Sequence, residues 1–190
     1  MSIQRLSNVM FREEIGFAIR EANMYANVGY TRDAVESANF AVGAILRNES
    51  ADEVIGQVAG SLIATSRLCI DRGDVDAAAA LLNGARAVCR ESHELYFDAT
   101  FMLAGLRMEA GNLRETYRLV EDANRPEVAK DDAEKQLSTI LLGILRVELT
   151  GVFRQLATDA SVVSGELGGP PTVIAVFKNH LVKMMKGESL

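Results

Sequence analysis

Apolar residues recur at alternating steps of three and four along most of the chain, the spacing of one face of an α-helix. The first such series stops at Gly29. Its members are Phe11, Ile15, Ala18, Ala22 and Tyr25. Further helical series run up to Gly73 and Gly111 and resume directly after each glycine. We therefore predict an all-helical fold of stacked antiparallel hairpins, each with a glycine-containing turn at its tip.

Capping residues indicate where these helices begin. Thr31, Asp74 and Asn112 follow the three glycines closely and are of the types that cap helix N-termini. Asn112 also stands three residues before Glu115, the spacing of a capping box. The hairpins are accordingly expected at about residues 9–47, 51–90 and 93–124.

A further helix is expected at about residues 132–163, and it is apolar over an unusually wide arc. Its apolar residues include Leu137, Ile140, Leu141, Leu142, Ile144 and Leu145. Such a helix is either sandwiched between neighbours or half-covered by a partner chain. We treat residues 1–163 as one helical-repeat domain on this basis.

Residues 164–171, with two glycines and two prolines in succession, are the clearest linker in the sequence. They separate the domain from an amphipathic helix expected within residues 172–190. Because a short helix is marginal alone in water, its apolar stripe should dock in cis as a cap or in trans on a second subunit. The residues predicted for this cap or oligomer interface are Leu141, Leu145, Val176, Phe177, Leu181 and Met184.

Small residues occupy equivalent positions around each turning glycine. They are Ala22, Ser66 and Ala104 seven residues before it, Ala34, Ala78 and Thr116 five after it, and Ala41, Ala85 and Ala123 twelve after it. With short turns and helices of about fourteen residues, this pattern resembles the tetratricopeptide repeat over about residues 16–128. In size and three-unit build the chain is also loosely similar to bacterial helical-repeat secretion chaperones.

The sequence departs from that family in two respects. The turning glycines are 44 and 38 residues apart, whereas the family repeats every 34. The aromatic residue usual near the start of each first helix is replaced by Ala18, Leu62 and Thr100. A generic antiparallel helical bundle is the alternative interpretation.

The resemblance implies a concave groove, lined by the first helix of each hairpin, that binds an extended or helical peptide. The matching positions are Ile19, Asn23 and Asn27, then Ile63, Arg67, Ile70 and Asp71, then Asp98, Phe101, Met108 and Glu109. Asn23 and Asn27 match two members of the family's clamp for a C-terminal carboxylate, but its other positions differ here. The groove would therefore suit an apolar or basic peptide, unless its apolar members belong to the core.

Composition and charge narrow the functional classes. The chain is 48% hydrophobic and 24% charged, as in ordinary soluble globular proteins. Its net charge of −6, without a basic stripe before the C-terminal segment, disfavours nucleic acid as a partner. The longest apolar run, Ile140–Leu145, is too short for a membrane span, and no signal-peptide core follows Met1. We expect a cytoplasmic protein without a membrane partner.

The two cysteines fit a reducing compartment. Cys69 lies four residues before Gly73 and Cys89 sixteen after it. On a hairpin their levels thus differ by about 18 Å of helix rise, too far for a disulfide. We expect both to be buried as small hydrophobic residues.

No pattern of catalytic or metal-ligating residues is present in the sequence. His93 and His180 are isolated, and no phosphate-binding loop or nucleophile motif occurs. We predict no catalytic residues, no metal and no cofactor. The leading hypothesis is a non-enzymatic protein-interaction scaffold, or chaperone-like adaptor, that binds a peptide segment of a partner. The alternatives are a homo-oligomeric assembly subunit that uses its C-terminal helices and a peptide-sensing regulator.

Overall fold

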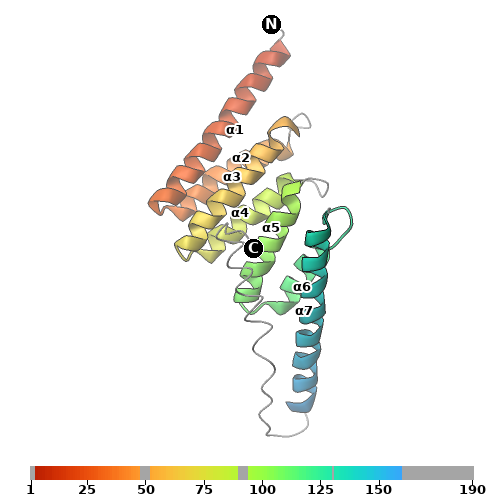
Figure 1. The fold of residues 1–190 in the computed structure, drawn as a ribbon. Helices are drawn as coiled ribbons and strands as arrows, with labels where there is room; N and C mark the ends of the chain where they lie inside the picture. Colours follow the sequence, from red (N-terminus) through yellow and green to blue (C-terminus); the bar gives the residue numbers. More distant parts are fainter. Residues whose placement is uncertain (1–2, 48–51, 90–93, 130, 160–190) are drawn as a thin grey trace. The chain divides into compact units, whose positions relative to one another are not determined.

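The computed structural model describes residues 3–47, 52–89, 94–129 and 131–159. Every regular element in these ranges is an α-helix, which confirms the predicted fold class (Figure 1). The helices are α1 (Ile3–Val28), α2 (Thr31–Leu46), α3 (Asp52–Asp71), α4 (Val75–Val88), α5 (Glu94–Glu109), α6 (Leu113–Ala123) and α7 (Asp132–Asp159). The chain divides into two compact units, Met1–Thr100 and Phe101–Leu190, with the division inside α5.

The three predicted turns share one backbone geometry. Gly29, Gly73 and Gly111 have φ angles of 94°, 77° and 75°, in the left-handed region that favours glycine. In each turn the glycine amide donates to the carbonyl three residues back, and the next amide donates to the carbonyl five residues back, at 2.8–2.9 Å. This pair of bonds is the Schellman motif, which satisfies the free carbonyls at the end of a helix.

The residue directly after each glycine is the N-cap of the next helix. These N-caps are Tyr30, Asp74 and Asn112. Each N-cap carbonyl accepts the first backbone bond of the new helix, at 3.0–3.1 Å. Only two or three residues therefore separate one helix from the next, and the same reversal occurs three times in the described residues.

The side-chain caps follow the prediction in the second and third turns but not in the first. Asp74 accepts from the Ala77 amide at 3.0 Å, and Asn112 accepts from the Glu115 amide at 3.2 Å.

Thr31 was expected to cap α2, but the left-handed glycine places the N-cap one residue earlier, at Tyr30, whose side chain makes no capping bond. The Thr31 hydroxyl instead donates to the Asp74 carboxylate of the second hairpin. This bond, followed by the Ala77 amide, holds the pKa of Asp74 below its ordinary value.

The first unit is a stack of two hairpins. α1 packs against α2 and α3, while α4 packs against α2 and α3 (Figure 1). The first helices of the two hairpins, α1 and α3, therefore pack against each other, and so do the second helices, α2 and α4. The contact between α2 and α4 is close, because a Cβ on Gly84 would stand 3.2 Å from Val42 Cγ2. Ala41 of α2 and Ala85 of α4 are also small and fully buried.

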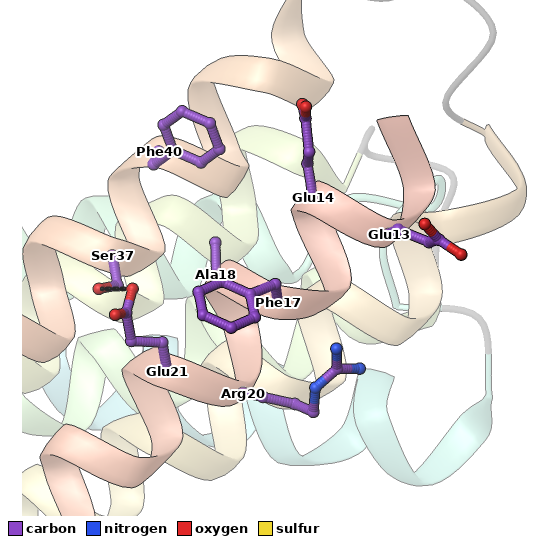
Figure 2. A pocket seen from close by; sticks show the side chains of 8 residues that line it. All are labelled: Glu13, Glu14, Phe17, Ala18, Arg20, Glu21, Ser37 and Phe40. Carbon is purple, nitrogen blue, oxygen red and sulfur yellow. Dashed lines mark hydrogen bonds between the residues drawn. The ribbon is translucent and has the colours of Figure 1, made fainter. Parts of the chain in front are cut away.

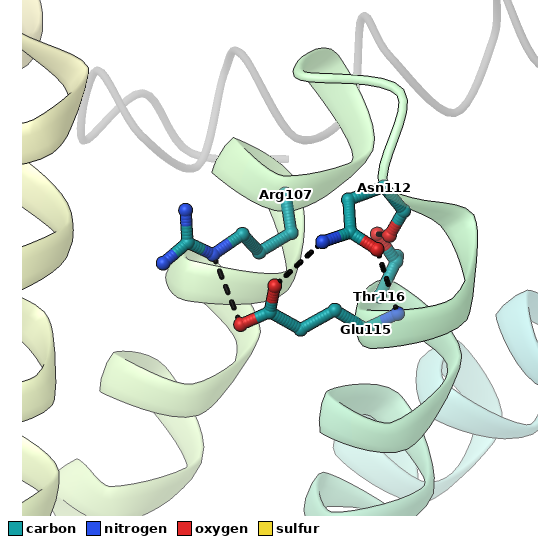
Figure 3. A network of polar contacts seen from close by, with 4 residues as sticks. All are labelled: Arg107, Asn112, Glu115 and Thr116. Atoms are coloured by element: carbon teal, nitrogen blue, oxygen red, sulfur yellow. Dashed lines mark hydrogen bonds and ion pairs between the residues drawn. The ribbon is translucent and has the colours of Figure 1, made fainter.

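In the second unit a polar network fastens α5 to α6 across the third turn (Figure 3). The Glu115 carboxylate accepts from Arg107 Nε at 3.1 Å and from Asn112 Nδ2 at 2.7 Å. The Thr116 hydroxyl donates to the Asn112 carbonyl at 2.9 Å. Glu115 thus binds both the helix that ends at this turn and the residue that caps the next one.

α7 packs against α6 in the second unit. Leu141, Leu142 and Leu145 of α7 are buried, whereas Ile140 is 61% exposed. The face of α7 that carries these leucines is therefore covered, whereas Ile140 is left in solvent. The predicted linker and C-terminal helix lie outside the described residues.

Cys69 and Cys89 are both buried and unpaired, as predicted. Burial raises the pKa of each thiol to about 11. At neutral pH the thiolate is therefore scarce, and the two residues behave as small hydrophobic side chains.

We predict that Gly73→Ala destabilises the protein by about 1–2 kcal/mol, the cost of left-handed backbone for an L-residue. Steric clash cannot contribute, because no atom lies within 4 Å of the added Cβ. The matched control is Gly143→Ala in α7, where the space is equally empty but the backbone is helical. It should stabilise the protein by about 0.5–1 kcal/mol. Chemical denaturation measures both, and two shifts of the same sign would contradict this account of the turns.

We also predict that Ala85→Leu costs about 1–3 kcal/mol, because the added atoms must enter the close contact made by α4. Asn83→Leu places the same side chain at an exposed position of the same helix. It should change the free energy of unfolding by less than about 0.5 kcal/mol. Equal unfolding midpoints for wild type and Ala85→Leu would show that the helices do not approach as closely as described.

Candidate functional site

The first helix of the stack is apolar on two sides. Its buried side, which includes Ile15 and Ala22, packs in the first unit. On the opposite side Met10, Phe17 and Met24 recur every seven residues, and each is more than half exposed. A surface helix normally has one apolar stripe and a polar remainder. The second stripe of α1 is therefore uncovered apolar surface.

A hollow of about 750 Å³ lies between this stripe and α2 (Figure 2). Phe17 and Ala18 line it from α1, and Phe40 lines it from α2. Ala18 is buried at its base, whereas Phe17 is 62% and Phe40 55% exposed. The hollow is within the usual range for binding pockets. It presents two aromatic rings to solvent over an apolar base.

Three carboxylates, those of Glu13, Glu14 and Glu21, also line the hollow. Glu21 accepts from the Ser37 hydroxyl at 3.0 Å and from the Tyr25 hydroxyl at 3.4 Å (Figure 2). Glu13 and Glu14 have no hydrogen-bond or ion-pair partner among the described residues. The negative charge of Glu21 is the main cause that raises the pKa of Tyr25. The lining of the hollow is thus acidic as well as apolar.

One cation also lines the hollow. The Arg20 guanidinium lies along its own helix, since a Cβ on Gly16 would stand 3.5 Å from Arg20 Nη1. No bond joins Arg20 to a carboxylate of the lining. The four charged residues therefore leave a formal charge of −2 on this surface, and two of the carboxylates remain available to a ligand.

The groove predicted from the family resemblance is partly buried. Ile19 and Ile63, from α1 and α3, are in the core of the first unit, and Phe101 and Met108 of α5 are also buried. Asn23, Arg67, Ile70 and Asp98 are half-buried, whereas Asn27, Asp71 and Glu109 are exposed. Four of the five apolar positions proposed as peptide anchors thus have little free surface, and the fifth, Ile70, is half-buried.

The structure does bring the two asparagines of that groove together. Asn27 Nδ2 donates to Asn23 Oδ1 at 2.9 Å, and Asn23 Nδ2 contacts Thr65 Oγ1 of α3 at 3.5 Å. The Arg72 guanidinium donates to the Asn27 carbonyl. These side chains form a polar seam between α1 and α3, and their amide groups already have partners.

The predicted cap or oligomer interface is described only in α7. Leu141 and Leu145 are each 1% exposed. Val176, Phe177, Leu181 and Met184 lie outside the described residues.

The described residues form neither a metal-binding cluster nor a membrane-spanning helix. No group of three or more His, Cys, Asp and Glu side chains there could hold a metal ion. None of the helices described is both long and apolar enough for a membrane span.

Sequence reasoning missed the hollow. No binding role was predicted for Glu13, Glu14, Phe17 or Phe40. The available signal was the seven-residue spacing of Met10, Phe17 and Met24, which lies opposite the series that begins at Phe11. An apolar series on each side of one helix indicates either deep burial or a docking surface.

Comparisons of the chain with protein-family models, with curated proteins and with solved structures gave no match. The function must therefore be inferred from the surface that these residues form.

Proposed function

We propose that this chain is a non-enzymatic protein-interaction scaffold, a chaperone-like adaptor that binds a peptide segment of a partner in the hollow on α1 and α2. The observation that carries this proposal is the exposure of Phe17 and Phe40, 62% and 55%, on a packed helical hairpin. Two large aromatic rings in solvent cost free energy unless a ligand covers them. Exposed apolar surface bordered by charge is typical of a docking site.

The scaffold supports this function because it holds the two rings on different helices of one hairpin. α1 and α2 pack against each other and are joined by the turn at Gly29. A ligand therefore meets a surface that needs little ordering, which lowers the entropic cost of binding. The repeated turn and the buried small residues also support the tetratricopeptide-like relationship, which we include in the proposal. The free thiols of Cys69 and Cys89 are compatible with a cytoplasmic location.

A homo-oligomeric assembly subunit is the second candidate. The exposure of Ile140 on α7 favours it, because that side chain would be covered in a complex of copies. The two functions differ in the surface that they use, α1 and α2 in the first and α7 in the second. Light scattering of Ile140→Ser and of a variant of the hollow distinguishes the two functions. Only an oligomer formed through α7 should dissociate when Ile140 is replaced.

We predict that a labelled amphipathic peptide of about 18 residues, with leucines at helical spacing and glutamine elsewhere, binds the full chain. The double variant Phe17→Ser, Phe40→Ser should bind it at least about tenfold more weakly, because apolar contact area is lost. Fluorescence anisotropy measures the affinity, and circular dichroism should show an unchanged unfolding midpoint.

The matched control is Val28→Ser, Leu46→Ser. These residues lie on the same two helices, are each 60% exposed, and do not line the hollow. The control should bind the peptide as the wild type does. Absence of binding, or an equal loss in both double variants, would contradict the proposed function.

A further inference from the structure

We propose that the segment bound in the hollow is a cationic amphipathic helix, with large apolar side chains over Phe17 and Phe40 and Lys or Arg beside Glu13 and Glu14. This inference rests on the proposed function and specifies the chemistry of the partner. Three observations support it: the shape of the exposed stripe, the negative charge of the lining, and the absence of a partner for Glu13 and Glu14 among the described residues.

The shape of the stripe favours a helical partner. Met10, Phe17 and Met24 form an exposed row along α1 at intervals of seven residues. At 1.5 Å per residue, this row is about 21 Å long. A helix that lies along α1 keeps its own apolar residues in step with such a row, because both repeat after two turns. Phe40 of α2 widens the row at its middle, where Phe17 stands.

The charge of the lining favours a basic partner. Glu13 and Glu14 precede Phe17 by about one helical turn, and Glu21 follows it by one turn. Neither Glu13 nor Glu14 is neutralised by another described residue, and Arg20 lies against Gly16 instead. Lys or Arg placed one turn from the apolar anchors of the ligand would meet these two carboxylates. The positive charge of such a ligand is attracted both by these two carboxylates and by the net charge of −6 on the chain.

The same charges act against other occupants. A second copy docked through this face would bring another surface of formal charge −2, so like charges would face one another. Nucleic acid and anionic lipid headgroups carry negative charge and would be repelled in the same way. A basic helix combines an apolar face with the opposite charge, and it therefore matches both properties of the hollow.

Three labelled peptides with identical leucine positions test the inference on the full chain. The other positions carry mainly lysine, glutamine or glutamate. The lysine peptide should bind about three- to tenfold more tightly than the glutamine peptide, and the glutamate peptide should bind most weakly. Raising the salt concentration from about 50 mM to about 500 mM should reduce the advantage of lysine, because exposed charges are screened.

The double variant Glu13→Gln, Glu14→Gln should lose most of the lysine advantage and bind the glutamine peptide as wild type does. Asp33→Asn, Glu36→Gln makes the same change of net charge at exposed positions of α2 outside the hollow, and it should retain the advantage. Equal effects of the two variants would overturn the inference, because attraction would then come from overall charge alone.

The outcomes distinguish this inference from the proposed function. If all three peptides bind equally and still require Phe17 and Phe40, the hollow is a binding site and its preference for a basic helix is wrong. If no peptide binds, the proposed function itself fails. If light scattering shows a dimer that Phe17→Ser, Phe40→Ser converts to a monomer, a second copy occupies the face and the inference is overturned.

Discussion

The left-handed glycine at the tip of each hairpin is the constraint on which the stack depends. At Gly29, Gly73 and Gly111 the backbone ends one helix with a Schellman motif and caps the next helix at the following residue. Because the reversal takes so few residues, the paired helices start close together. Small buried side chains at fixed distances from the turns, such as Ala41 of α2 and Ala85 of α4, also allow helices of neighbouring hairpins to approach closely. Turn geometry and packing are thus two consequences of one repeated sequence pattern.

That design leaves one face of the first helix without a neighbour in the first unit. In the first unit α3 packs between α1 and α4. α1 contacts α2 and α3 and exposes Phe17 on its other side. The end of a stack of helices is ordinarily polar or covered by a cap, because it faces solvent. Here the end surface is instead apolar and acidic, with Phe17 and Phe40 in solvent beside Glu13 and Glu14. We interpret this departure from a polar cap as the mark of a docking site.

Much of the fold could be predicted from the sequence because helical periodicity and turning glycines are local signals. The N-cap of α2 was misplaced because Thr31 is the better capping residue by type, while the backbone at Gly29 selects Tyr30. Periodicity also cannot separate a core residue from a groove residue. Ile19 and Ile63 satisfy the helical pattern in either role, and only their burial assigns them to the core.

The hollow depends on how α1 packs against α2, and it was therefore harder to predict. Phe17 and Phe40 are 23 residues apart, and the sequence around each of them does not indicate that both side chains remain exposed. Their relation to Glu13 and Glu14 follows from how α1 and α2 pack. The carboxyl-terminal positions Val176 and Phe177 lie beyond the described residues, so their predicted role as a cap stays a prediction.

The most direct measurement is a titration of the isotope-labelled full chain with the lysine peptide, followed by amide nitrogen–proton correlation spectra. If the hollow is the binding surface, the largest shifts should fall on Glu13–Glu21 and on the turn of α2 that carries Ser37 and Phe40. Shifts concentrated instead on the polar seam at Asn23 and Asn27, or on α7, would contradict the account.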